Sequence, residues 1–106
     1  MKNVSKLVRN NIPDIIRASN GSPVFRILSD DEFVLAIFDK FYEEIEEVRS
    51  SQGAERCEEL ADIIELINIL AILESKSLDY IIKLSKEKAK NNGGFDKKIF
   101  LEKVND

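Results

Sequence analysis

A chain of 106 residues with 43% hydrophobic content can form one domain with a modest core, so we expect a single domain spanning residues 1–106. The sequence contains no His, which excludes imidazole-based zinc sites, Glu-x-x-His di-iron sites and His-dependent acid–base catalysis. Any active metal must therefore be held by oxygen atoms, and the single Cys57 excludes an internal disulfide.

The net charge of −4 conceals a segregation of charge along the chain. Residues 1–29 carry a net +4, residues 30–79 a net −11 and residues 80–106 a net +3. Nucleic-acid-binding proteins usually present a basic stripe without so acidic a centre, so we expect no nucleic-acid partner. A metal–phosphate ligand fits better, because carboxylates can hold the cation while flanking Lys and Arg side chains contact phosphate oxygens.

The sequence shows no apolar leader and no apolar run long enough to span a bilayer. We therefore expect a cytoplasmic protein without a membrane partner.

Short elements are predicted at the two ends of the chain. Asn11 and Pro13 favour the start of a short helix, with Asn11 as its N-cap and Asn20-Gly21 as its end. The runs 24–28 and 97–101 are rich in β-branched and aromatic residues, which is typical of strands. We expect these two runs to pair as a minor two-stranded β element of an otherwise all-α protein.

Three longer helices are predicted between these ends. Ser29 and Glu32 match a capping box at the start of a helix over about 30–50. The break at 50–53 is short, so the next helix, about 54–74, should run antiparallel to the first and form an α-hairpin. Ser77 can cap a third helix over about 78–90, which the Asn-Asn-Gly-Gly run at 91–94 ends.

The second helix of this hairpin is apolar on nearly every side from Leu60 to Leu73. A helix of this kind must be covered on every side, and the chain has too few other helices to do so. The pattern predicts a homodimer or a dimer of dimers packed along this segment.

The hairpin carries two carboxylate pairs, Glu44 with Glu47 and Glu59 with Asp62, each spaced i,i+3 and therefore neighbours on a helix surface. Ordinary solvated helix faces are one interpretation, because fifteen acids within fifty residues make some such pairs inevitable. The positions of the residues favour a second interpretation, a metal site. Glu59 falls within the apolar sector and Glu44 at the edge of the apolar stripe, whereas Glu46 faces solvent. Four carboxylates that converge there would require a hard cation.

Several motifs together resemble the MazG-like all-α NTP pyrophosphatases, in particular the small stand-alone phosphoribosyl-ATP-pyrophosphohydrolase-like proteins. These motifs cover nearly the whole chain and are Lys6-Leu7-Val8-Arg9 with Ile12-Pro13, Glu43-Glu44-Ile45-Glu46-Glu47-Val48, Glu59-Leu60-Ala61-Asp62, Lys88, Gly93-Gly94-Phe95 and Ile99-Phe100-Leu101.

The resemblance implies an all-α helical bundle built around an antiparallel α-hairpin, assembled from dimers. It also implies Mg²⁺-dependent cleavage of a nucleoside triphosphate between its α and β phosphates, with Mn²⁺ as a substitute cation. The products would be a nucleoside monophosphate and pyrophosphate, and the role would be nucleotide-pool sanitation, or house-cleaning.

Carried over by position, the resemblance also implies roles for individual side chains. The metal ligands would be Glu44, Glu47, Glu59 and Asp62. The phosphate contacts would come from Lys88 and from Arg9 or Lys6. Apart from the resemblance, the chemistry of metal-assisted hydrolysis leads us to expect that a carboxylate not fully committed to the metal, Glu43 or Glu47, accepts the proton of the attacking water.

The chain departs from the family pattern at three positions, Asn10, Asn11 and Asn92, where charged residues are common. These departures reduce the cationic contacts to phosphate and leave the substrate open. Two alternatives stand beside the main hypothesis. One is a non-catalytic helical dimerisation or regulatory module, and the other is the phosphoribosyl-ATP pyrophosphohydrolase of histidine biosynthesis.

Overall fold

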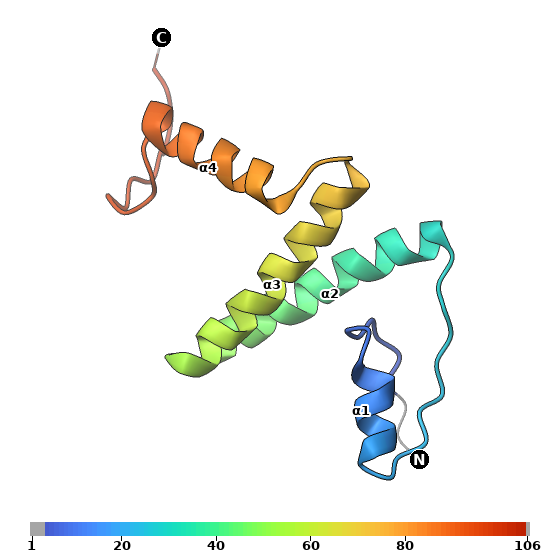
Figure 1. The fold of residues 1–106 in the computed structure, drawn as a ribbon. Coiled ribbons are helices and arrows are strands. Elements are labelled where there is room, and N and C mark those ends of the chain that lie inside the picture. Colours follow the sequence, from blue (N-terminus) through green and yellow to red (C-terminus); the bar gives the residue numbers. More distant parts are fainter. Residues whose placement is uncertain (1–3, 106) are drawn as a thin grey trace. The chain divides into compact units, whose positions relative to one another are not determined.

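The computed structural model describes residues 4–105, which form four α-helices and, within that range, no β-strand. The helices are α1 (Ile12–Ala18), α2 (Asp30–Ser50), α3 (Ala54–Leu73) and α4 (Leu78–Asn92), as Figure 1 shows. The prediction of an all-α fold is confirmed. The three longer helices begin at the expected residues and end within two residues of the expected ends.

The chain divides into two compact units, one up to Leu66 and the other from Ile67 onward. The boundary falls inside α3, which is a continuous helix. The first unit holds α1, α2 and the part of α3 up to Leu66, and the second holds the rest of α3 and α4. The expectation of a single domain stays a prediction.

Helix α2 begins at the expected capping box. The Ser29 hydroxyl accepts a hydrogen bond from the Glu32 amide at 3.3 Å, and the Ser29 amide donates to Glu32 Oε1 at 3.1 Å. Two amides that the first helical turn leaves without partners are thereby satisfied. Arg26 adds an ion pair to Glu32 Oε2 at 2.6 Å, which ties the preceding connection to the helix start.

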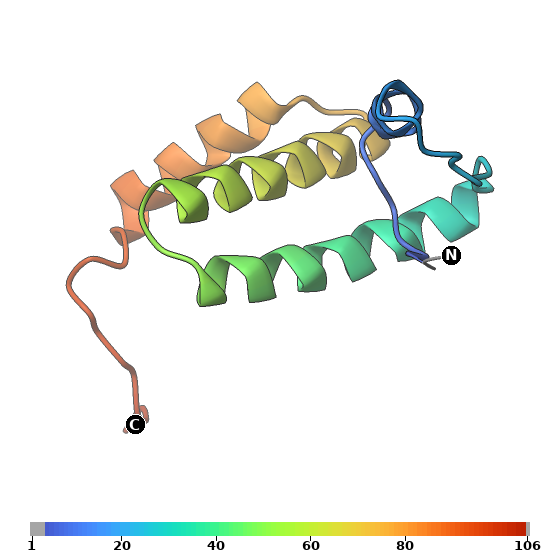
Figure 2. The same cartoon turned by 90° about the horizontal axis from the view of Figure 1, so that it is seen from below.

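The connection between α2 and α3 makes the hairpin antiparallel, as Figure 2 shows for α2 and the N-terminal part of α3. Gly53 has φ +65°, a left-handed conformation that glycine adopts at little cost and that lets three residues reverse the chain. The Ser51 hydroxyl donates to the Glu47 carbonyl at 2.7 Å, and Arg56 Nε donates to the Val48 carbonyl at 3.0 Å. These bonds satisfy carbonyls at the end of α2.

Helix α4 in the second unit also begins and ends as the sequence predicts. The Ser77 hydroxyl accepts a hydrogen bond from the Tyr80 amide at 3.1 Å. Gly93 follows the last helical residue with φ +87°, a conformation that residues with a side chain rarely adopt.

The short helix α1 forms where expected with Asn11 at its N-cap position, as predicted, but the Asn11 side chain does not cap the helix. Asn11 makes no side-chain cap hydrogen bond, because its backbone is already helical at φ −90° and ψ −2°. A capping side chain reaches back to the second or third helical amide from an extended backbone, which Asn11 lacks.

The predicted β element is also wrong, since neither 24–28 nor 97–101 forms a strand. Val24 and Ile27 are 100% and 88% exposed, so the first run crosses from α1 to α2 without a partner. Lys98 has φ +62°, and its amide donates to the Phe95 carbonyl at 3.2 Å, so a turn interrupts the second run. Strand composition forms a strand only where a hydrogen-bonded neighbour is present.

No helix among residues 4–105 combines the length and the apolar character needed to cross a membrane.

Ile37 on α2 is completely buried, so a substitution at this position tests how much core packing contributes to stability in the first unit. Replacing Ile37 with Ala should reduce the free energy of unfolding by about 2–5 kcal/mol, because buried methyl groups are lost and a cavity remains. Leu35→Ala is the matched control, since Leu35 lies on the same helix and is 69% exposed. Urea unfolding of both variants measures the difference, and equal losses would contradict the assignment of Ile37 to the core.

Candidate metal centre

Carboxylate oxygens of Glu44, Glu59 and Asp62 lie within 4.8 Å of one another. Glu44 comes from α2, whereas Glu59 and Asp62 lie one turn apart on α3. The antiparallel hairpin brings the two helix faces together, so all three residues belong to the first unit. We call these three residues the carboxylate cluster.

Glu44 is the unusual member of the cluster, because only 5% of it is exposed. Its Oε2 atom is buried and, among the described residues, has no hydrogen-bond donor. A buried carboxylate oxygen without a partner costs free energy, which a proton or a cation would offset. The cluster fits a hard divalent cation, because all its donors are oxygen atoms and the Glu44 carboxylate keeps one buried oxygen without a partner among the described residues.

Glu59 is the member that responds most strongly to its neighbours. Its pKa is raised from 4.5 to about 7, first by a hydrogen bond with the Glu44 carboxyl group, then by burial and by the charges of Glu44, Glu47 and Asp62. Carboxylates this close repel one another when all are ionised, which favours the protonated form of Glu59. Protonation of Glu59 would relieve the same repulsion that a bound cation would relieve.

Three cationic side chains contact the cluster or its neighbour Glu43. Arg9 Nη2 lies 2.7 Å from Asp62 Oδ1, and Lys6 Nζ lies 3.2 Å from Glu43 Oε1. Lys40 Nζ lies 3.2 Å from Glu43 Oε2 and 3.4 Å from Glu44 Oε1. Arg9 and Lys6, which the resemblance assigns to phosphate, thus contact carboxylates in the structure, and their contact with phosphate stays a prediction.

Sequence reasoning missed Lys40. The available signal was its spacing, i,i+3 from Glu43 and i,i+4 from Glu44, which makes the three side chains neighbours on one helix face.

Glu43 is held on both of its oxygens, by Lys6 on Oε1 and by Lys40 on Oε2. Burial alone would raise the pKa of Glu43, but the hydrogen bonds and charges of Lys40 and Lys6 outweigh burial and lower it. A carboxylate with a lowered pKa is a weaker proton acceptor. Of the two residues predicted as the base, Glu43 is therefore the less suited.

Glu47 is exposed and lies outside the group of three. Its charge is nevertheless one of the causes of the raised pKa of Glu59. Its roles as a metal ligand and as a proton acceptor stay predictions.

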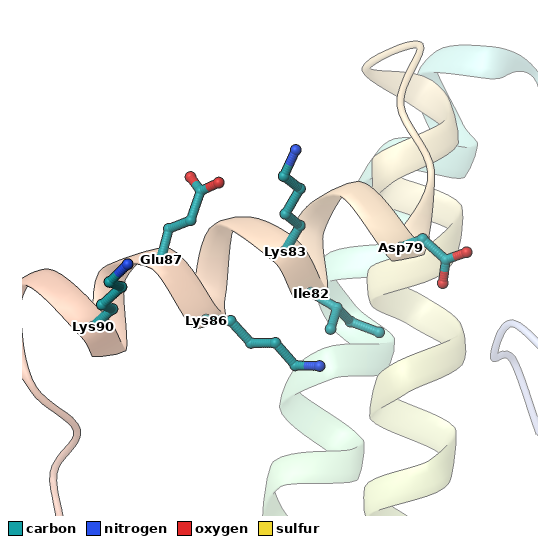
Figure 3. A pocket seen from close by; sticks show the side chains of 6 residues that line it. All are labelled: Asp79, Ile82, Lys83, Lys86, Glu87 and Lys90. Atoms are coloured by element: carbon teal, nitrogen blue, oxygen red, sulfur yellow. The ribbon is translucent and has the colours of Figure 1, made fainter.

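Lys88 lies on α4 in the second unit and is exposed. The same helix lines an open hollow of about 460 Å³, drawn in Figure 3, whose lining residues are Asp79, Ile82, Lys83, Lys86, Glu87 and Lys90. Lys88 is absent from this lining. Because one helix supplies the whole lining and its charges are mixed, we assign no ligand to the hollow.

Comparison with known proteins gives one informative match. An uncharacterised protein of Mycolicibacterium smegmatis (strain ATCC 700084 / mc(2)155) is 48% identical over 48 residues. The match covers 45% of this chain and 49% of the relative, so it spans about half of the relative's length. No known protein family and no solved structure matches the chain. The function therefore has to be argued from the site.

The raised pKa of Glu59 predicts a pH dependence of stability in the metal-free protein. Between about pH 4.5 and pH 7 the folded chain binds more protons at Glu59 than the unfolded chain does. Stability should therefore fall as pH rises through this window. Glu59→Gln should flatten this part of the profile, measured by thermal unfolding in metal-free buffer.

The control for this measurement is Glu58→Gln, which removes an exposed acid beside Glu59. It should keep the wild-type profile. A Glu59→Gln profile that matched the wild type would contradict the raised pKa of Glu59.

Proposed function

We propose that this protein is a Mg²⁺-dependent nucleotide pyrophosphohydrolase that cleaves the α–β phosphate bond of a nucleoside triphosphate. The proposal of a metal site is supported by the carboxylate cluster and by Glu44 Oε2, which is buried and has no partner among the described residues. The reaction and the substrate class are supported by the resemblance of the chain's motifs to the MazG-like NTP pyrophosphatases.

Glu44, Glu59 and Asp62 would hold the cation, with the nearby Glu47 as a fourth ligand or as the proton acceptor. Bound Mg²⁺ supplies charge neutralisation for the phosphate oxygens of the substrate. Glu47 is the better placed proton acceptor, because both oxygens of Glu43 are engaged by lysines. Glu43 then serves to hold Lys6 and Lys40 beside the site.

Arg9 is an exchangeable counter-ion in this proposal. In the metal-free protein it neutralises Asp62 through a contact whose two side chains are 56% and 37% exposed. Exposed ion pairs are worth only about 0.2–1 kcal/mol, so a divalent cation can replace Arg9 on Asp62. The released guanidinium then becomes available for a phosphate group, which it can contact through two parallel hydrogen bonds.

We propose a homodimer, or a dimer of dimers, as the working assembly in the cytoplasm. Apolar side chains of α3 remain 45–56% exposed in the single chain, namely Leu60, Ile64, Ile72 and Leu73. A second copy packed along α3 would remove this apolar surface from water.

The proposed reaction is tested by incubating the protein with a panel of nucleoside triphosphates and Mg²⁺ and measuring pyrophosphate and nucleoside monophosphate. Glu59→Gln and Asp62→Asn should each reduce turnover by at least about 100-fold, because the metal contributes several kcal/mol of charge stabilisation. Glu46→Gln is the control, since Glu46 is exposed on α2 and pairs with Arg49. The absence of pyrophosphate with every nucleotide, or full turnover in both variants, would overturn the proposal.

If the cation displaces Arg9 from Asp62, the variant Arg9→Ala should affect Mg²⁺ binding and nucleotide binding in opposite directions. Arg9→Ala should bind Mg²⁺ up to about fivefold more tightly without nucleotide, because the competing cation is removed. The same variant should have a higher KM for the nucleotide, because a phosphate contact is lost. Calorimetry and steady-state kinetics measure the two effects.

Arg17→Ala is the matched control for Arg9→Ala, since Arg17 forms a similarly exposed ion pair with Asp14 at 2.7 Å. It should change neither quantity. Weaker Mg²⁺ binding by Arg9→Ala would show that Arg9 orients Asp62 instead of competing for it.

A further inference from the structure

Lys40 differs from Lys6 and Arg9 in two ways: its side chain is more buried, and it lies on the same helix as Glu44. Its side chain is 18% exposed, whereas those of Lys6 and Arg9 are 45% and 56% exposed. It lies on α2, one turn before Glu44, so the helix itself fixes the spacing between the two residues.

The contact of Lys40 with Glu44 separates the roles of the two carboxylate oxygens. Lys40 Nζ lies 3.4 Å from Glu44 Oε1, while Glu44 Oε2 is buried and has no donor among the described residues. A carboxylate is planar, so restraining Oε1 from one side also restrains the direction of Oε2. The second contact of Lys40, to Glu43 Oε2 at 3.2 Å, limits the motion of the ammonium group itself.

We infer that Lys40 is a positioning residue that holds Glu44 by Oε1 and so presents Oε2 to the divalent cation. This inference rests on the metal site proposed above and adds a residue that the motifs do not contain. Partners that orient metal ligands in this way typically change metal affinity by about 10–100-fold when they are removed.

Simple electrostatics predicts the opposite effect of Lys40 on metal binding. A positive charge this close to a cation site repels the cation, so its removal alone should strengthen binding. Positioning predicts that removal weakens binding, because Glu44 then loses its fixed orientation. The sign of the change in affinity therefore separates a positioning residue from a bystander charge.

The experiment measures Mg²⁺ and Mn²⁺ affinity by calorimetry for the wild type, Lys40→Met, Lys40→Arg and Arg49→Met. Lys40→Met keeps an unbranched side chain of similar length and removes the charge. Lys40→Arg keeps the charge and the hydrogen-bond donors. Arg49→Met is the matched control, because Arg49 also lies on α2 and pairs with an acid three residues away, at 3.4 Å.

We expect Lys40→Met to bind both metals at least about tenfold more weakly. Lys40→Arg should recover most of the affinity, and Arg49→Met should match the wild type. Thermal unfolding checks that each variant is folded, and if Lys40→Met does not fold, Lys40→Gln, which also removes the charge, takes its place with the same expected loss of affinity. Unchanged or tighter binding by folded Lys40→Met, or no recovery in folded Lys40→Arg, would overturn the role of Lys40 and leave the proposed function standing. A wild-type protein that binds neither metal would overturn the proposed metal site and, with it, the role of Lys40.

Discussion

Burial of the Glu44 carboxylate against Glu59 and Asp62 is the constraint on which the proposed site depends. Three carboxylates whose oxygens lie within 4.8 Å of one another cannot all remain ionised without compensation. Three features of the structure respond to this charge: the raised pKa of Glu59, the contact of Lys40 with Glu44 and the contact of Arg9 with Asp62. Each of these responses reports the same excess of negative charge, which a hard cation would neutralise at one point.

The cations around the site differ in how firmly they are held, and this difference gives them different uses. Lys40 is nearly buried and lies on the same helix as its partners, so it can orient a ligand. Arg9 is mostly exposed and precedes α1 in the chain, so it can leave Asp62 when a stronger cation arrives. In the proposed function, cation binding would therefore come first and would release Arg9 for a phosphate contact.

The small core explains why a partner copy is part of the proposal. Among the described apolar residues only Ile37, Leu66 and Ala71 are buried, while residues such as Phe95 and Phe100 are 100% and 86% exposed. A chain of this length gains little stability from so few buried side chains. Contact with a second copy would supply the burial that the single chain lacks, and it would do so along the helix that also carries Glu59 and Asp62.

The sequence by itself determined the helices, because caps and breaks such as Ser29, Gly53 and Gly93 act within a few residues of the chain. Helical spacing also placed Glu59 and Asp62 on one face, and the motifs pointed to Arg9 and Lys6. Only the tertiary structure decided that Glu44, and not Glu47, joins that pair, and that 24–28 and 97–101 lack partner strands. It also decided that Lys40 lies between Glu43 and Glu44 in a nearly buried position. These outcomes depend on the distance between separate elements and on burial, which local spacing along the chain does not specify.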